Sequence, residues 1–417
     1  MEKQVNLDRI SNLPWDVLDS ILVHMPLKEA VRTSVLSSKW RYKWTGLSQF
    51  IIDDKCFTNT ILDKVARWKE IMKIIHLVQL NHGGPLEKFT LAAYCHPDHA
   101  DLDQWIYFLA QKGIKELILQ EFDSVKRFKL PSCLFSCSQL KRLELSDCSI
   151  KLSCEFRGFN NLAILQLTQV YIDSDTLESL ILKCPVLERL TLSLLDNQAA
   201  FKIHNPNLKY LKIDSDFLDI CLENSPSLDV VDIRLRHDKH QPRRFDLGQP
   251  CNVARVLSCL PGVKRLTLCC EFLQFLANRN IPERHRSLLD HLSVLDLREV
   301  RFRHLKEVMT ALCILRSAPN LEELFVSVYD QTSDFSRPVI DFLRAQYMLD
   351  LYLSHLRVVK IRGVSGVESP EWEFIKFILA HSPVLETVTT VRYRGERVPQ
   401  SLFQQVISVL FAVTVLL

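Results

Sequence analysis

The sequence predicts an α/β solenoid: a short helical segment at the N-terminus, then stacked repeats with a curved parallel sheet inside and helices and loops outside. Two observations predict this fold. One six-residue pattern of apolar residues recurs from residue 86 onward, and a pattern with helical spacing fills the first forty-odd residues. Because a single short repeat cannot bury its own apolar face, repeats of this kind must stack to form a core.

The recurring pattern has apolar residues at its first, fourth and sixth positions. Consecutive copies begin 20 to 35 residues apart, as from Leu208 to Leu228 and from Leu228 to Val263. This irregular period is typical of leucine-rich repeats. The twelve copies begin at Leu86, Ile114, Leu140, Leu162, Leu187, Leu208, Leu228, Val263, Leu292, Leu321, Leu356 and, in a degraded form, Leu385.

Helical spacing follows several of the predicted strands. It is clearest in residues 101–111, 175–182 and 303–315. Residues 50–52 look like an earlier, shortened strand, and residues 61–80 look like its helix. We therefore expect the alternation of strand and helix to begin directly after the N-terminal segment, without a flexible linker.

Within each predicted strand, the residues between the apolar positions point to the concave side of the sheet. These positions hold charges of both signs and a few aromatic residues, a mixture that suits protein recognition. The alternative, for part of them, is ordinary solvated surface. The predicted target-binding residues are Arg142, Glu144, Arg189, Tyr210, Lys212, Asp232, Arg265 and Phe325.

The first forty-odd residues predict three short helices. Val17, Leu18, Ile21 and Leu22 have the spacing of an amphipathic helix, and Pro26 cannot continue it. A second helix is expected around residues 27–35, and a third after Ser37-Ser38, with Trp40 and Trp44 one turn apart. So little chain cannot enclose a core of its own. We therefore expect another molecule to cover one apolar face.

These residues resemble the F-box over about residues 7–47. The resemblance is carried by Asp8-Arg9-Ile10-Ser11, Leu13-Pro14, Ile21-Leu22, Met25-Pro26, Ala30, Leu36-Ser37, Lys39-Trp40-Arg41 and Trp44. It implies docking on a Skp-type adaptor and, through the adaptor, on cullin and RING subunits. The alternative is a helical cap whose apolar residues face the repeats. The residues implied to bind the adaptor are Leu13, Pro14, Leu18, Ile21, Leu22, Pro26, Leu27, Val31, Leu36, Trp40 and Trp44.

The C-terminal region resembles the FBD module that follows leucine-rich repeats in many plant F-box proteins. Leu356, Val359, Ile361 and Gly363, the acidic helix start at residues 371–373, and the segment 382–386 carry this resemblance. Residues 401–417 depart from the polar ending typical of the family. The expected domains are an F-box at 1–47, leucine-rich repeats at 48–345, and FBD-like repeats with a cap at 346–417.

The sequence predicts no catalytic residue, no cofactor and no metal. It contains no phosphate-binding glycine loop, no GxSxG, no HExxH and no RING-type Cys/His lattice. The densest group of metal-ligand residue types, at 95–99, lacks paired zinc spacing. The basic runs at 234–244 and 279–286 are read as solvated loops, and a net charge of +3 does not favour nucleic acid as a partner.

Cysteine usage and the chain ends indicate the compartment. Thirteen cysteines are scattered without a CxxC pair, and the charged N-terminus lacks an apolar signal segment. Thiols in a reducing compartment fit this pattern, so we expect an intracellular protein of the nucleus, the cytoplasm or both. The apolar tail, residues 406–417, is shorter than the roughly 20 residues of a membrane span, so no membrane is expected.

The resemblance implies the substrate-recognition subunit of a cullin–RING (SCF) ubiquitin ligase. The chain would not be an enzyme, because other subunits would carry the ubiquitin chemistry. It would hold a target protein on its repeats and thereby promote the target's ubiquitination. The alternatives are a scaffold of the same architecture without a degradation target, and a sensor of a small molecule.

Overall fold

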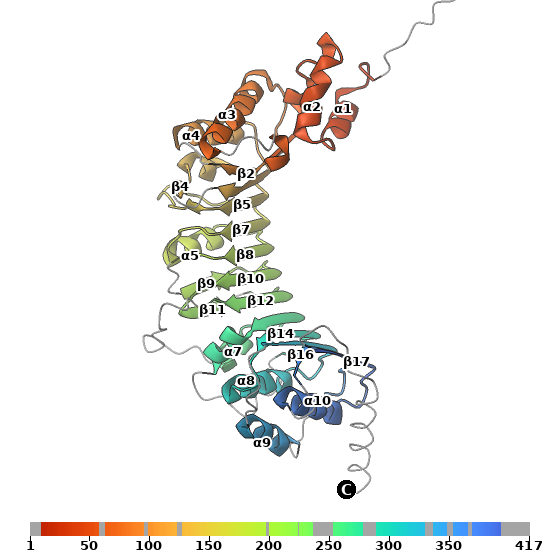
Figure 1. The fold of residues 1–417 in the computed structure, drawn as a ribbon. Coiled ribbons are helices and arrows are strands. Elements are labelled where there is room, and N and C mark those ends of the chain that lie inside the picture. Colours follow the sequence, from red (N-terminus) through yellow and green to blue (C-terminus); the bar gives the residue numbers. More distant parts are fainter. Residues whose placement is uncertain are drawn as a thin grey trace, which may run out of the picture. The chain divides into compact units, whose positions relative to one another are not determined.

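The computed structural model describes residues 10–57, 63–95, 99–122, 127–196, 200–223, 225–236, 253–277, 289–329, 337–347, 353–365 and 369–392. The chain forms two compact units, Met1–Asn197 and Gln198–Leu417. Each unit is built on a parallel sheet, which confirms the α/β repeat fold (Figure 1).

The head, which we define as residues 10–47, starts the first unit. Helix α1 (Trp15–Leu22) follows Pro14, and helix α2 (Leu27–Arg32) follows Pro26, because proline at a helix start gives up no helical hydrogen bond. The 3₁₀ turn η1 (Thr33–Val35) extends α2.

The third helix predicted for the head is replaced by two 3₁₀ turns, η2 (Ser38–Trp40) and η3 (Lys43–Gly46). The backbone of Tyr42 (φ −126°, ψ 13°) leaves the helical region between them and separates the two tryptophans into different turns. The expectation that Ser37 caps a helix is also wrong, since its hydroxyl makes no capping bond.

The sheet of the first unit runs in the order β1-β2-β3-β5-β7-β8, all parallel. Helices α3 and α4 lie beside its first strands (Figure 1). The elements are β1 (Gln49–Asp53), η4 (Asp54–Cys56), α3 (Lys64–Asn81), β2 (Lys88–Cys95), α4 (His99–Gln111), β3 (Glu116–Phe122), β4 (Phe128–Lys129), η5 (Ser132–Ser136), β5 (Arg142–Ser146), β6 (Cys148–Ser149), β7 (Ile164–Thr168), α5 (Ser174–Leu182) and β8 (Arg189–Ser193).

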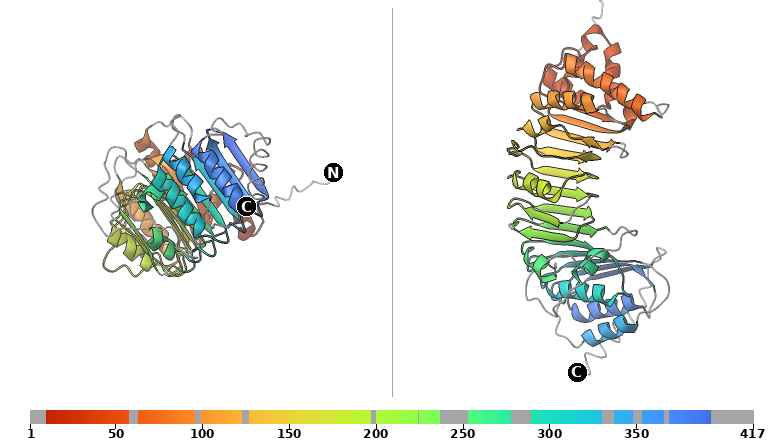
Figure 2. Two further views of the ribbon diagram at one scale, coloured as in Figure 1. Left: turned by 90° about the horizontal axis from the view of Figure 1, so that it is seen from below. Right: turned by 90° about the vertical axis from the view of Figure 1, so that its left-hand side faces the viewer.

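The second unit repeats this plan, with parallel strands in the order β10-β12-β13-β14-β15-β16-β17 and a separate pair, β9 and β11. Helices α8, α9 and α10 cover one face of its sheet (Figures 1 and 2). The elements are β9 (Ala200–His204), β10 (Tyr210–Ser215), β11 (Asp219–Glu223), β12 (Val230–Leu235), α6 (Val253–Ser258), β13 (Arg265–Cys269), α7 (Cys270–Leu276), β14 (Val294–Val300), α8 (Leu305–Arg316), β15 (Glu323–Val328), α9 (Arg337–Gln346), β16 (Val358–Val364), α10 (Pro370–His381) and β17 (Thr387–Arg392).

The apolar pattern fixes the register of both sheets. Leu117, Leu143, Leu165 and Leu190 stand side by side on consecutive strands, and each is almost fully buried. Only the degraded last copy leaves its first residue, Leu385, partly exposed. The ladder of buried residues is therefore continuous within each unit, as stacked repeats require.

Repeat length decides whether a helix follows the strand. The shortest steps, such as those that begin at Leu187 and Leu208, contain the short strands β9 and β11 instead of a helix. The longer steps from Val263 onward each contain a helix. No helix of the described residues is both long and apolar enough to cross a membrane.

Candidate functional site

The head has a small apolar interior of its own. One stripe of α1, Leu18 and Leu22, is buried, and so are Trp40 and Trp44 from the 3₁₀ turns. The Trp40 indole Nε1 donates to the Ser11 hydroxyl at 2.6 Å, which ties the last turns to the segment before α1. This interior accounts for both tryptophans without any partner.

The head is fastened to the first repeat. The Asp19 carboxylate on α1 accepts from the Ser48 amide at 3.0 Å and from the Ser48 hydroxyl at 2.6 Å. The buried His82 ring lies 3.1 Å through Nε2 from the Leu47 carbonyl oxygen, and burial lowers the pKa of this imidazole. Head and sheet therefore meet without a linker, as the sequence predicted.

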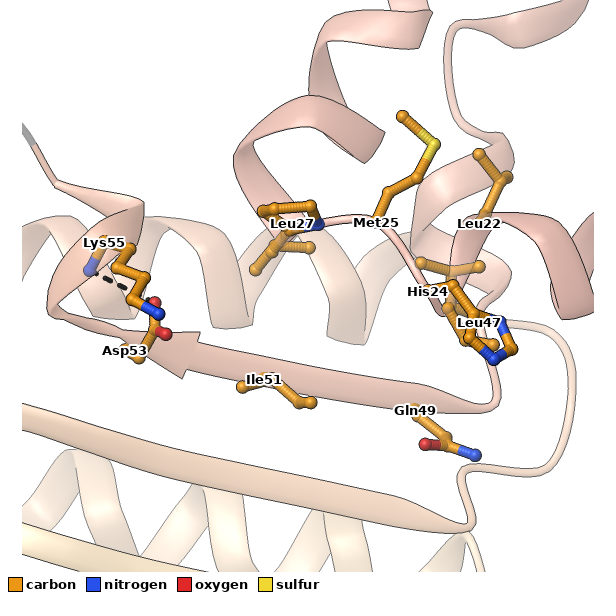
Figure 3. A pocket seen from close by; sticks show the side chains of 11 residues that line it. Leu22, His24, Met25, Leu27, Leu47, Gln49, Ile51, Asp53 and Lys55 are labelled. Atoms are coloured by element: carbon orange, nitrogen blue, oxygen red, sulfur yellow. Dashed lines mark hydrogen bonds between the residues drawn. The ribbon is translucent and has the colours of Figure 1, made fainter.

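A hollow of about 230 Å³ lies where the α1–α2 connection passes β1. Figure 3 shows Leu22, Met25 and Leu27 on the helical side and Ile51 along the strand. Since β1 is the last strand of its sheet, the head covers an edge that would otherwise be open to other strands.

The outer surface of the head is unusually apolar. Ile21 on α1 is 48 % exposed, and Leu36, which follows η1, is 66 % exposed. Such side chains normally avoid water, and a concentration of them marks an interaction surface. The exposed large apolar residues of the head are Ile10, Trp15, Val17, Ile21, Val35, Leu36 and Tyr42.

The structure sorts the eleven predicted adaptor-binding residues by burial. Pro14, Ile21, Pro26 and Leu36 are exposed, and Leu13 and Val31 are half-buried. The other five, Leu18, Leu22, Leu27, Trp40 and Trp44, are buried within the unit and form its interior in this conformation. Their contact with an adaptor stays a prediction.

Val17 and Val35 were not among the predicted contacts, although both are exposed. The signal for Val17 was available in the sequence. Pro14, Val17 and Ile21 follow one another at helical spacing, on a stripe beside the buried Leu18–Leu22 stripe.

On the concave face of the first unit, the predicted target-binding residues differ in availability. Glu144 is 6 % exposed and accepts from Gln120 Nε2 at 2.8 Å and from Arg142 Nε at 2.6 Å. It therefore joins strands β3 and β5, and only Arg142 of this pair reaches solvent substantially. Arg189 on β8 is exposed.

On the same face of the second unit, Asp232 lies 3.6 Å from Arg298, and burial raises the pKa of the Asp232 carboxyl. The ammonium of Lys360 stands 5.2 Å from the centre of the Phe325 ring. A hollow of about 360 Å³ opens here, and Arg362 also lines it.

Three cations surround Phe325 in this hollow, which the sequence did not reveal because they come from two strands, β14 and β16. The remaining lining residues are Asp296, Val326 and Ser327. The other predicted target-binding residues are Tyr210 and Lys212, which are half-buried, and Arg265, which is exposed.

Other sequence features lie mostly outside the described residues. These are 96–98 of the metal-ligand group, the basic runs beyond Arg236, and the tail 401–417. Two arginines of the first run are described and paired: Arg236 donates to Asp214 at 2.6 Å, and Arg234 lies 3.8 Å from Glu299.

Comparison with known proteins identifies the family. Family models match residues 10–51 (F-box domain), 102–326 (LRR repeats of FBD-associated F-box protein At5g56370) and 350–389 (FBD). The F-box/FBD/LRR-repeat protein At1g13570 of Arabidopsis thaliana is 37% identical over 383 residues, which cover 92% of this chain and 90% of the relative. The chain belongs to the F-box/FBD/LRR-repeat family.

More distant relatives from the same plant span the family pattern. F-box/LRR-repeat protein 13 is 25% identical over 423 residues, covering 92% of this chain and 89% of its own length. F-box/FBD/LRR-repeat protein At1g78750 is 25% identical over 421 residues with the same coverage. The apolar head is therefore the F-box of this family member, and the resemblances read from the sequence are confirmed.

Proposed function

We propose that this chain is the substrate-recognition subunit of an SCF ubiquitin ligase. Its F-box binds a Skp-family adaptor, and its leucine-rich repeats hold a target protein whose ubiquitination the complex promotes. The observation that carries the proposal is the exposed apolar surface of the F-box, from Ile10 to Tyr42. The chain itself supplies proximity and orientation rather than chemistry.

The adaptor contact has the chemistry of a stable protein interface. Ile21 and Leu36 each leave about half or more of the side chain in water in this chain alone. Covering such side chains with a partner supplies the desolvated centre that binding requires. The buried stripe of α1 holds the helix in place while the exposed stripe meets the adaptor.

The hollow beside Phe325 is the best-formed candidate for a target contact in the second unit. Its lining contains Arg298, Lys360 and Arg362 against one carboxylate, that of Asp296. An acidic segment of a target complements this balance of charge. Ordinary solvated surface at these positions is the competing interpretation.

The test combines adaptor binding with target turnover. The chain is co-purified with a Skp-family adaptor as wild type, as Leu13→Ala/Pro14→Ala, and as Leu182→Asp, which alters an exposed leucine (54 %) on α5 of the repeats. Adaptor binding is expected to fall in the F-box variant and to persist in the α5 variant. Equal adaptor recovery in all three contradicts the assignment.

Target levels separate the remaining possibilities. A substrate receptor lets its target accumulate when the chain is removed, whereas a scaffold leaves all target levels unchanged. The expected location is inside the cell, in the nucleus, the cytoplasm or both, where the ubiquitin machinery operates.

A further inference from the structure

Strands β9 and β11 bring together three side chains of different ligand chemistry. They are parallel neighbours in register, with Glu223 opposite His204, and Cys221 two residues before Glu223 (Figure 1). Alternate residues of a strand share a face, so all three side chains stand on the same outer face of the pair. One ligand atom from each lies within 4.8 Å of the other two.

The inner face of the pair is firmly packed. Phe201 and Ile203 of β9 and Ile220 and Leu222 of β11 are buried. The Phe201 ring meets Phe217 edge-on at 5.4 Å between centroids. This packing fixes the two backbones, so the outer groups are held at a set separation before any ligand arrives.

The polar groups of this outer face already point at one another. The Cys221 thiol donates to Glu223 Oε1 at 3.0 Å. His204 is half-buried and makes no hydrogen bond or ion pair with any other described residue. The nearby cation Arg255 lies 3.6 Å from Asp219, whose carboxylate partly offsets its charge.

We propose that His204, Cys221 and Glu223 form a binding site for a zinc-class divalent transition metal ion. An imidazole nitrogen, a thiolate and a carboxylate oxygen suit Zn²⁺, and their bond lengths place ligand atoms about 3.3–3.8 Å apart in a tetrahedral site. The present separations need only small side-chain rotations to reach that range. The thiol proton is released to solvent on binding, and a water molecule fills the fourth position.

The ion would fasten β9 to β11 on the side of the second unit away from the concave strands. These residues form no recognisable zinc motif in the sequence, because His204 and Cys221 come from different repeats. The site is independent of the F-box and of target binding.

The test is a titration of the metal-free full chain with Co²⁺, which reports thiolate ligation through a near-ultraviolet charge-transfer band. The wild type is expected to gain this band with one equivalent, and Cys221→Ser is expected to lose it. His204→Ala and Glu223→Gln should each weaken binding by about tenfold or more. Cys154→Ser, which changes an exposed cysteine of the first unit, is the matched control and should keep the band.

Thermal unfolding with Zn²⁺ supplies a second measurement, since a ligand that binds only the folded chain raises Tm. Zn²⁺ should raise the Tm of the wild type and of Cys154→Ser but not that of Cys221→Ser, and Mg²⁺ should raise none. A wild type without the cobalt band, or a Cys221→Ser variant with the full band, overturns the proposal.

Discussion

Helix α1 carries two neighbouring stripes with opposite expected roles, and paired substitutions separate them. Leu18 is 1 % exposed and Ile21 is 48 % exposed, although both are large aliphatic residues on the same helix. Leu18→Ala leaves a cavity in the F-box interior and is expected to cost about 2–5 kcal/mol of local stability. Ile21→Ala removes groups that already face water, so its effect is expected to stay within about 0.5 kcal/mol.

Amide hydrogen exchange of the α1 peptide in the isolated chain measures this difference. A loss of 2 kcal/mol or more corresponds to exchange faster by roughly 30-fold, because each 1.4 kcal/mol is a factor of ten in the opening equilibrium. The Ile21→Ala peptide should exchange within about threefold of the wild type. Equal acceleration in both variants, or none in Leu18→Ala, would refute the division of α1 into an interior stripe and a binding stripe.

Three further predictions concern the first unit. Asp173 caps α5 by accepting from the Thr176 amide at 2.8 Å, so Asp173→Ala should cost about 1 kcal/mol in urea unfolding, while Asp173→Asn keeps most of the stability. Gly158 has φ +105° and an added Cβ would lie 2.2 Å from the Lys183 carbonyl oxygen, so Gly158→Ala should cost about 2 kcal/mol or more, and Gly83→Ala, in open space, much less. Burial lowers the folded-state pKa of His82 below 6.5, so the unfolded chain takes up the proton first; Tm should fall as pH drops below 6.5, and His82→Asn should flatten that dependence.

Much of the repeat fold was predictable because each strand announces itself locally. Leu143 and Leu145, for example, are both buried where their spacing places them, and the helix predicted at 175–182 is α5 almost to the residue. Gly113, predicted to stop the helix before it, has φ +72° just after α4 ends.

The less predictable features depend on contacts between distant segments. The short strands β9 and β11 form only because neighbouring repeats pair, and neither has a strong pattern of its own. The same limit applies to the F-box: helical spacing identified an apolar surface but not which residues of it are interior. Trp40 belongs to the interior because Ser11, 29 residues earlier, returns to meet it.

The central claim, that a Skp-family adaptor covers the apolar face of the F-box, is tested most directly by calorimetric titration of the adaptor into three chains: wild type, Ile21→Asp/Leu36→Asp, and Leu182→Asp. Loss of two buried aliphatic contacts is expected to raise Kd by about 100-fold or more in the F-box variant. The Leu182→Asp chain should bind like the wild type. An unchanged Kd in the F-box variant, or no binding by the wild type, would contradict the account.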